Sequence, residues 1–404
     1  DFETAYGNLG YIYNKLGEYE KAIGYLQKAL ELKPTYYLAL SNMGNSYQML
    51  EKYDMAKAYY NELARIKPNY AQAYFGLAAV ALALEDYDEA IAMAAKATNL
   101  DPSDAGNYWL EGYILERAGK TDQAEERYKK AIQTDPNYTE AHYNLASLYD
   151  DQYKNQEALE YYRNAVALEP NKVEAWNGLG NIYYRIPEYD NALDAYNKAL
   201  EIDPKYSYAY FNKGNLFRDR EDYTNAIQSF KKALEFDPDN ASTYYSMGLT
   251  YYETNNNDED ALYCFEKSAE IRPNYVYTWH NLGDVNKRLD RKEQAIHAYT
   301  KAIEIDPQSD YAYIGIGEVY LNDFEYTSAL QFFEKALQIA PDSQLALNNL
   351  GDTYMKLDET DKALATYKKV VEVAPDNTYA HVALAEIFLD KEQYNDALYH
   401  AKMG

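Results

Sequence analysis

Hydrophobic and small residues recur at helical spacing in two consecutive stretches that end at Pro204. The apolar positions of the first stretch are Trp176, Leu179, Gly180 and Tyr183, and those of the second are Ala192, Tyr196 and Ala199. Positions three and four residues apart lie on one face of an α-helix. The pattern therefore predicts two amphipathic helices joined by a short turn. Pro204 ends the second helix because proline cannot continue one.

The same unit recurs along the chain, and prolines mark its period. All but one of the prolines follow one another at a spacing of about 34 residues, with a single spacing that is longer by one. They are Pro34, Pro68, Pro102, Pro136, Pro170, Pro204, Pro238, Pro273, Pro307, Pro341 and Pro375. We predict a single array over residues 1–404 whose repeats start near residue 3, with one 35-residue repeat near 241–275 and an incomplete last repeat at 378–404.

Small and aromatic residues keep fixed positions in each unit. The glycine slot, which is the position of Gly180 in the unit that ends at Pro204, holds Gly10, Gly44, Gly112, Gly180, Gly214, Gly248, Gly283, Gly317 and Gly351, with Ala78 and Ala146 elsewhere. The aromatic slot, which is the position of Tyr196 in that unit, holds Tyr60, Tyr128, Tyr162, Tyr196, Phe230, Phe265, Tyr299, Phe333 and Tyr367. Glycine inside a helix costs about 1 kcal/mol relative to alanine. Its recurrence therefore predicts that the two helices of a unit pack closely, with the aromatic ring filling the space between units.

The run W-x2-L-G-x2-Y, followed by A-x3-Y-x2-A-x4-P, at residues 176–204 resembles the tetratricopeptide repeat. The resemblance extends over essentially the whole chain. It implies an all-α, right-handed superhelical solenoid of about eleven and a half helix–turn–helix repeats. In this family first helices line a concave groove and second helices form the convex face. The resemblance further implies a protein–protein interaction scaffold or adaptor that binds extended peptides or helical segments in the groove, within a multi-subunit assembly.

An alternative function is open at this point. The array resembles the tetratricopeptide part of O-GlcNAc transferase, so it is also consistent with a non-catalytic arm that recruits substrates for a larger glycosyltransferase-like enzyme. Both functions assign peptide binding to the same groove. They differ in whether a catalytic domain belongs to the same protein.

Net charge, cysteine content and apolar runs limit the classes of partner that we expect. The chain has 65 acidic and 39 basic side chains, a formal net charge of -26, spread over both halves. Such a charge repels nucleic acid and anionic membranes and favours basic partners, although solubility is an alternative reason for it. The single cysteine, Cys264, cannot form an intrachain disulfide, which fits the cytoplasm. The longest nearly apolar run, residues 73–84, is too short to cross a bilayer. We expect protein partners, no nucleic acid and no membrane insertion.

No constellation of catalytic or metal-binding residues is found in the sequence. The five histidines do not form ligand pairs at helical spacing, and one cysteine cannot supply a zinc set. His142 and His381 stand where other units carry tryptophan or tyrosine, so we predict that they are buried in the core. The lengthened turn around Asn255, Asn256 and Asn257 is acidic but lacks the glycine of a calcium loop. We therefore expect no enzyme activity, no cofactor and no metal.

Asparagines recur two residues before the glycine slot, a position we call the ladder slot. They are Asn8, Asn42, Asn144, Asn212, Asn281 and Asn349. A similar ladder in O-GlcNAc transferase holds the backbone of extended peptides, and an amide can both donate to and accept from a peptide group. We predict that these residues, together with Asn45, Asn177, Asn181 and Asn215, lie in the peptide-binding groove. A purely structural role for asparagine in this slot is the alternative.

Aromatic residues precede the ladder slot in the middle of the array. They are Phe75, Trp109, Tyr143, Phe211 and Tyr245. Together with Ala79 and Tyr113 they predict an apolar groove floor, because exposed aromatic patches mark interaction sites. Burial of these rings by local stacking is the alternative.

Charged residues recur near the ends of first helices and also occur directly before the glycine slot. Basic residues near the ends of first helices, namely Arg185, Arg218, Lys287, Arg288 and Lys356, suit the helix dipole and are also candidates to anchor a carboxylate. Glu111 and Lys213 replace the hydrophobic residue before the glycine slot. We expect their stems to pack while their charged groups reach water.

Overall fold

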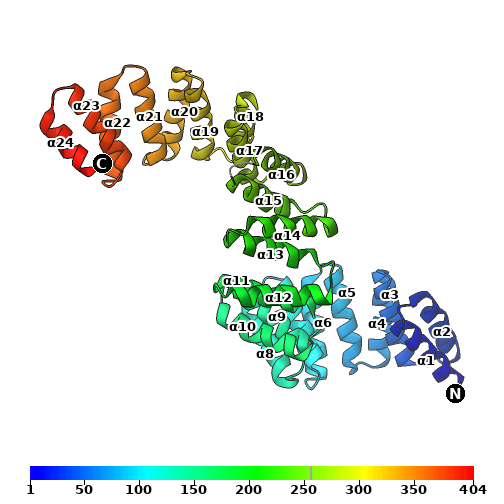
Figure 1. Cartoon of the computed structure of the whole chain (residues 1–404). Helices are drawn as coiled ribbons and strands as arrows, with labels where there is room; N and C mark the ends of the chain where they lie inside the picture. Colours follow the sequence, from blue (N-terminus) through cyan, green and yellow to red (C-terminus); the bar gives the residue numbers. More distant parts are fainter. Residues whose placement is uncertain (255–256) are drawn as a thin grey trace. The chain divides into compact units, whose positions relative to one another are not determined.

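The computed structural model describes residues 1–254 and 257–404, and in these residues every regular element is an α-helix. The first twelve helices are α1 Phe2–Lys15, α2 Tyr19–Leu32, α3 Tyr37–Met49, α4 Tyr53–Ile66, α5 Ala71–Ala83, α6 Tyr87–Leu100, α7 Ala105–Arg117, α8 Thr121–Thr134, α9 Thr139–Asp151, α10 Asn155–Leu168, α11 Val173–Arg185 and α12 Tyr189–Ile202. They are followed by α13 Ser207–Asp219, α14 Tyr223–Phe236, α15 Ala241–Glu253, α16 Asp258–Ile271, α17 Val276–Arg288, α18 Lys292–Ile305, α19 Asp310–Asn322, α20 Tyr326–Ile339, α21 Gln344–Lys356, α22 Thr360–Val373, α23 Thr378–Asp390 and α24 Tyr394–Met403. The predicted all-α class is confirmed (Figure 1).

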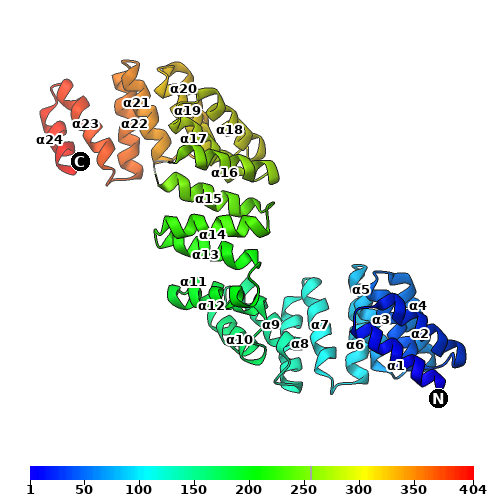
Figure 2. The ribbon, with the colours of Figure 1, turned by 45° about the vertical axis from the view of Figure 1, so that its right-hand side comes forward.

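Consecutive helices pack as hairpins, each made of an odd-numbered first helix and an even-numbered second helix. The pairs α13–α14 and α15–α16 lie side by side in both views (Figures 1 and 2). The last hairpin joins α23 to a shorter, 10-residue α24. In the lengthened turn, Asn255 and Asn256 lie outside the described residues, and Asn257 is the N-cap of α16.

The chain divides into two compact units, Asp1–Pro204 with α1–α12 and Lys205–Gly404 with α13–α24. Within each unit, successive first helices approach each other: α1 with α3, α3 with α5, α5 with α7, α7 with α9, α9 with α11, α13 with α15, α17 with α19, and α19 with α21. Successive second helices show no comparable approach in the described ranges. The first helices therefore lie on the inner side of the curvature inside each unit. The prediction of one array over residues 1–404 stays a prediction.

In the hairpins that have an aromatic residue in the aromatic slot, its ring lies at the centre of the packing. Tyr60 of α4 is 4 % exposed and contacts the backbone of Gly44 on α3 and of Gly76 on α5. A Cβ atom added to Gly44 would lie only 2.6 Å from the Tyr60 ring. The ring is thus held between the glycine slot of its own repeat and the ladder slot of the next. This packing explains why Gly76 interrupts the row of ladder asparagines.

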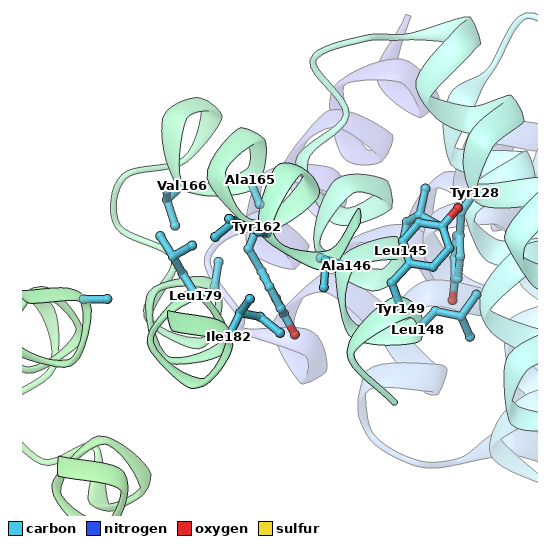
Figure 3. Close-up of a cluster of buried hydrophobic side chains, with 14 of the residues drawn as sticks. Tyr128, Leu145, Ala146, Leu148, Tyr149, Tyr162, Ala165, Val166, Leu179 and Ile182 are labelled. Atoms are coloured by element: carbon cyan, nitrogen blue, oxygen red, sulfur yellow. The ribbon is translucent and has the colours of Figure 1, made fainter. Parts of the chain in front are cut away.

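The same arrangement is visible further along the unit. In Figure 3, Tyr162 of α10 points between Ala146 of α9 and Ile182 of α11, inside a cluster that also contains Leu145 and Leu179. All five side chains are nearly or completely buried. The core is therefore a string of such clusters between neighbouring hairpins, each repeat packing mainly on the next.

The position four residues before the glycine slot carries a second recurring contact. His142 Nε2 lies 3.0 Å from the carbonyl oxygen of Pro136, and His381 Nε2 lies 2.9 Å from that of Pro375. Trp176 Nε1 donates to the Pro170 carbonyl at 2.9 Å in the same way. Both histidines are buried, so their prediction as core residues is confirmed. Each also binds the backbone of the preceding inter-repeat turn.

The expectation for Glu111 is wrong. Its side chain is buried, with the residue 5 % exposed, and its Oε1 lies 3.0 Å from Arg127 Nε of α8. Its Oε2 accepts a hydrogen bond from Thr98 Oγ1 of α6 at 2.9 Å. The carboxylate is stabilised by these partners inside the packing, so it does not reach water. Lys213 is half-buried, and burial lowers the pKa of its ammonium group.

Two further observations bear on membrane insertion and on metal binding. None of the helices in the described part of the chain has the length and apolar character needed to cross a membrane. Across residues 1–254 and 257–404, no group of three or more histidine, cysteine, aspartate and glutamate side chains is arranged to hold a metal ion.

Candidate protein-binding face

All the predicted groove residues lie on first helices. In unit Asp1–Pro204 they are Asn8 of α1, Asn42 and Asn45 of α3, Phe75 and Ala79 of α5, Trp109 and Tyr113 of α7, Tyr143 and Asn144 of α9, and Asn177 and Asn181 of α11. In unit Lys205–Gly404 they are Phe211, Asn212 and Asn215 of α13, Tyr245 of α15, Asn281 of α17 and Asn349 of α21. Asn8 and Asn45 are exposed, and the others are partly buried.

Several of the asparagines already bridge elements of the protein. Asn181 Oδ1 accepts a hydrogen bond from the Tyr196 hydroxyl at 2.9 Å. Asn281 Nδ2 donates to the Tyr245 hydroxyl at 3.1 Å, and Asn349 Nδ2 donates to Glu318 Oε1 at 2.9 Å. An amide used in this way retains part of its bonding capacity, because it has two donors and an acceptor. The predicted groove asparagines therefore include structural amides as well as exposed ones such as Asn8 and Asn45.

Trp109 has three aromatic or polar side-chain partners. Its ring stacks on Tyr113 with a centroid distance of 5.9 Å and an interplanar angle of 12°. It also lies 6.2 Å from the ring of Tyr138. The indole Nε1 donates to Asn144 Oδ1 on α9 at 3.1 Å. This half-buried cluster, which we call the Trp109 cluster (Trp109, Tyr113 and Asn144), joins two neighbouring first helices and remains partly accessible.

Three other predicted aromatic residues pack against the aromatic slot of their own hairpin. Ring centroids are 6.0 Å apart for Tyr143 and Tyr162, 6.1 Å for Phe211 and Phe230, and 5.8 Å for Tyr245 and Phe265. Phe75 packs against two core clusters around α5. Each ring is thus partly buried by stacking and partly open. Local stacking covers part of each ring, and a role of these residues in binding stays a prediction.

Arg185 and Arg288, two of the basic residues at first-helix ends, bind acids of neighbouring repeats. Arg185 Nη2 lies 2.7 Å from Asp150 Oδ1, and Arg288 Nη1 lies 2.9 Å from Asp258 Oδ1. Burial raises the pKa of Asp150, and Arg185 opposes that shift. These cations are therefore used to join hairpins and are less available to anchor a partner's carboxylate.

Models of the tetratricopeptide repeat match most of the chain. Those described as tetratricopeptide repeat cover residues 4–36, 35–103, 146–207, 195–228, 276–309 and 321–387, and one described as TPR repeat covers 112–152 and 214–255. The chain belongs to the tetratricopeptide repeat family. A tetratricopeptide repeat array is a protein-interaction scaffold, and its architecture is typical of proteins without catalytic activity.

Solved structures with a similar course of the chain include other tetratricopeptide proteins. MamA is 28% identical over 42% of this chain and 92% of its own, with a TM-score of 0.39. YrrB, described as a TPR protein with an unusual peptide-binding site, is 26% identical over 47% of this chain and 97% of its own, with a TM-score of 0.43. The Cut9 and Hcn1 hetero-tetramer of the APC/C gives 14% identity over 100% of this chain and 93% of that one, with a TM-score of 0.47. No curated protein matches the chain.

The tetratricopeptide repeats of unit Lys205–Gly404 carry acidic residues that our sequence reasoning missed. The position after the glycine slot holds Asp284, Glu318, Asp352 and Glu386, on α17, α19, α21 and α23. We call these four residues the carboxylate row. In the preceding repeats the same position holds neutral residues, from Tyr11 to Leu249. The repeat period that revealed the asparagines could have revealed this row too.

Tyrosine hydroxyls bind two members of the carboxylate row. Asp284 accepts from the Tyr299 hydroxyl at 2.6 Å and from the Tyr311 hydroxyl at 2.7 Å. Asp352 accepts from the hydroxyls of Tyr367 and Tyr379 in the same manner. Burial and the adjacent Asp352 carboxylate raise the pKa of Tyr379 to about 12, so this hydroxyl keeps its proton and remains a donor.

Proposed function

We propose that this tetratricopeptide repeat protein is an adaptor that holds an extended or helical segment of another protein against its first helices, within a multi-subunit assembly. The Trp109 cluster is the observation that carries the proposal. It combines a partly open aromatic stack with an amide on the neighbouring helix. An aromatic surface of this kind binds apolar side chains, and an amide binds the backbone between them.

The spacing of first helices suits an extended segment. Packed helices lie roughly 10 Å apart, and an extended chain advances about 3.3 Å per residue. A segment crossing the first helices would therefore meet a ladder slot about every third residue, and about half of these slots carry asparagine. Amide contacts alone do not read side chains, so the aromatic residues are the part of this face that would select a sequence.

Selection of peptides from a phage-displayed random library against the full chain tests the proposal. We expect the selected peptides to lose about five-fold in affinity for each of the variants Asn8→Ala and Asn45→Ala, because a hydrogen bond contributes about 1 kcal/mol. We expect a larger loss for Trp109→Ala, and Trp109→Phe keeps the ring if the alanine variant is unstable.

The matched control is an exposed asparagine on second helices. Asn61 of α4 and Asn99 of α6 are exposed, so Asn61→Ala and Asn99→Ala remove the same group from the other side of the hairpins. Peptides that bind all the first-helix variants as tightly as these controls would contradict the proposal.

A further inference from the structure

A cavity of about 670 Å³ lies against the first helices α19, α21 and α23. Its apolar lining includes Leu321, Met355, Val382 and Ile387. Helices α21 and α23 are not among the closely approaching pairs of first helices. The cavity thus opens where the packing of first helices is looser, and it is distinct from the Trp109 cluster of the other unit.

An exposed aromatic side chain stands at this cavity in a strained backbone conformation. Phe324 is 77% exposed, lines the cavity, and has a φ of 60°. Most repeats have a non-glycine residue with the same positive φ at this turn position, whereas Gly17 and Gly119 adopt it without strain. Tyr153, at the same position in another repeat, is equally exposed, but the Arg185 guanidinium lies 5.2 Å from the centroid of its ring. Phe324 contacts Tyr326 edge-on at 6.4 Å, and most of its ring is open.

The carboxylates of the cavity differ from those of neighbouring repeats in their partners. Lys287 Nζ lies 2.5 Å from Glu318 and 3.7 Å from Asp284, so one ammonium group serves both acids. Asp352 and Glu386 both line the cavity. Within residues 1–254 and 257–404 neither of them forms an ion pair.

The other charged and titratable groups at the cavity offset only part of the negative charge of these two acids. Lys356 is the one cation among the lining residues, and it is exposed. The hydroxyls of Tyr367 and Tyr379, which also line the cavity, donate to Asp352 and carry no charge. The cavity therefore has two carboxylates against one ammonium group, beside an apolar wall.

We propose that this cavity binds an arginine side chain of a partner segment, with flanking apolar residues packed on Phe324 and Met355. The inference rests on the proposed function, since it assigns a partner chemistry to the first-helix face. A guanidinium group can pair with a carboxylate while its plane stacks on an aromatic ring. The partner is thus a protein segment in which arginine alternates with apolar residues, and a net charge of -26 attracts it.

Fluorescence anisotropy with the full chain and a defined probe tests this assignment. The probe is a short fluorescein-labelled peptide in which arginine alternates with leucine, and the comparison peptide carries neutral citrulline in place of arginine. We expect the arginine peptide to bind at least about ten-fold more tightly than the citrulline peptide, because neutral citrulline cannot form the charge-assisted hydrogen bonds of arginine. A lysine version should bind with intermediate affinity.

Variants then locate the binding. We expect Asp352→Asn with Glu386→Gln to weaken the arginine peptide about ten-fold, and Glu386→Gln or Phe324→Gly alone to weaken it less. The control Glu334→Gln with Glu372→Gln removes the same charge from exposed positions on second helices α20 and α22 and should leave affinity within about two-fold. Equal binding of the arginine and citrulline peptides, or equal loss in the control, overturns the inference. Phage-selected peptides that remain sensitive to Trp109→Ala would in that case still support the proposed function.

Discussion

At the scale of single residues, the glycine slot sets how closely two helices approach. Gly44 faces the Tyr60 ring, which is itself held from the other side by Gly76. We expect Gly44→Ala to destabilise the protein by about 1–3 kcal/mol, because the ring has no free space to move into. Urea unfolding followed by circular dichroism measures the change.

Gly24 provides a control, because its replacement by alanine is expected to change stability in the opposite direction. Gly24 lies in the exposed part of α2, and a Cβ atom there would meet no heavy atom within 4 Å. Gly24→Ala should therefore stabilise the protein by about 1 kcal/mol through helix propensity alone. If both substitutions changed stability in the same direction, close packing would not be the reason for the glycine slot.

Phe324 allows a prediction in which stability and binding change in opposite directions. A non-glycine residue in the left-handed region costs about 1 kcal/mol or more, and the exposed Phe324 ring has little packing to lose. We expect Phe324→Gly to raise the free energy of unfolding by about 1 kcal/mol while it weakens binding of the arginine peptide. Chemical denaturation of the variant measures the first effect.

The matched comparison is Tyr153→Gly. Tyr153 has the same kind of positive φ, 58°, but stacks under Arg185, so its removal also loses a cation–π contact. The gain in stability should be smaller than for Phe324→Gly. A loss of stability for Phe324→Gly would show that the ring contributes to packing, which contradicts its assignment to ligand binding.

At the scale of helices, Glu111 connects three elements, since it binds Arg127 of α8 and Thr98 of α6 from its place on α7. Removing one partner of a buried ion pair leaves an uncompensated charge. We expect Arg127→Ala to cost about 2 kcal/mol, less than for a fully buried pair because Arg127 is about a third exposed.

Replacement of the acid itself should be tolerated. Leucine or another hydrophobic residue stands at the Glu111 position in most repeats, so Glu111→Leu is expected to be neutral or stabilising. Thermal unfolding of both single variants and of the double variant gives the coupling between the two positions. An Arg127→Ala variant as stable as the wild type would show that the pair contributes nothing to the packing of α7 on α8.

The helices and their order could be predicted from the sequence because each depends on local signals. Regularly spaced prolines, together with the small and aromatic slots, locate the hairpins and the residues between them. The burial of His142 and His381 also followed from their positions in the period. The burial of Glu111 did not, because it depends on Arg127 and Thr98, which other repeats do not provide.

The candidate site was less predictable for the same reason. Which asparagines are exposed depends on partners in adjacent helices, such as Tyr196 for Asn181 and Glu318 for Asn349. The carboxylate row was visible in the period but was not recognised. Two acids of the row pair with Lys287, and the other two have no ion-pair partner among the described residues. The sequence could not show this difference, because it depends on the positions of side chains about one repeat apart.

At the scale of the whole molecule, repetition multiplies the effect of one buried group. Six repeats carry a buried tyrosine in the aromatic slot, and burial raises the pKa of each: Tyr60, Tyr128, Tyr162, Tyr196, Tyr299 and Tyr367. In the unfolded chain a tyrosine has a pKa of about 10. The protonated form is therefore favoured by folding, and this stabilisation is complete below about pH 10 and is lost as pH rises toward the folded pKa.

We therefore expect the helices to unfold in alkaline solution over a narrow range above about pH 10, with ionisation of the buried tyrosines. Each such group contributes up to about 1.4 kcal/mol per pH unit to the loss of stability, and the groups in neighbouring repeats act together because each repeat is stabilised by the next. Circular dichroism and tyrosinate absorbance, recorded in one pH titration, should change at the same pH. Tyr60→Phe with Tyr162→Phe should move the transition to higher pH, since phenylalanine already occupies this slot in Phe230, Phe265 and Phe333. Ionisation of all tyrosines near pH 10 with helicity unchanged would mean that these six rings are open to solvent, contrary to their burial between the helices.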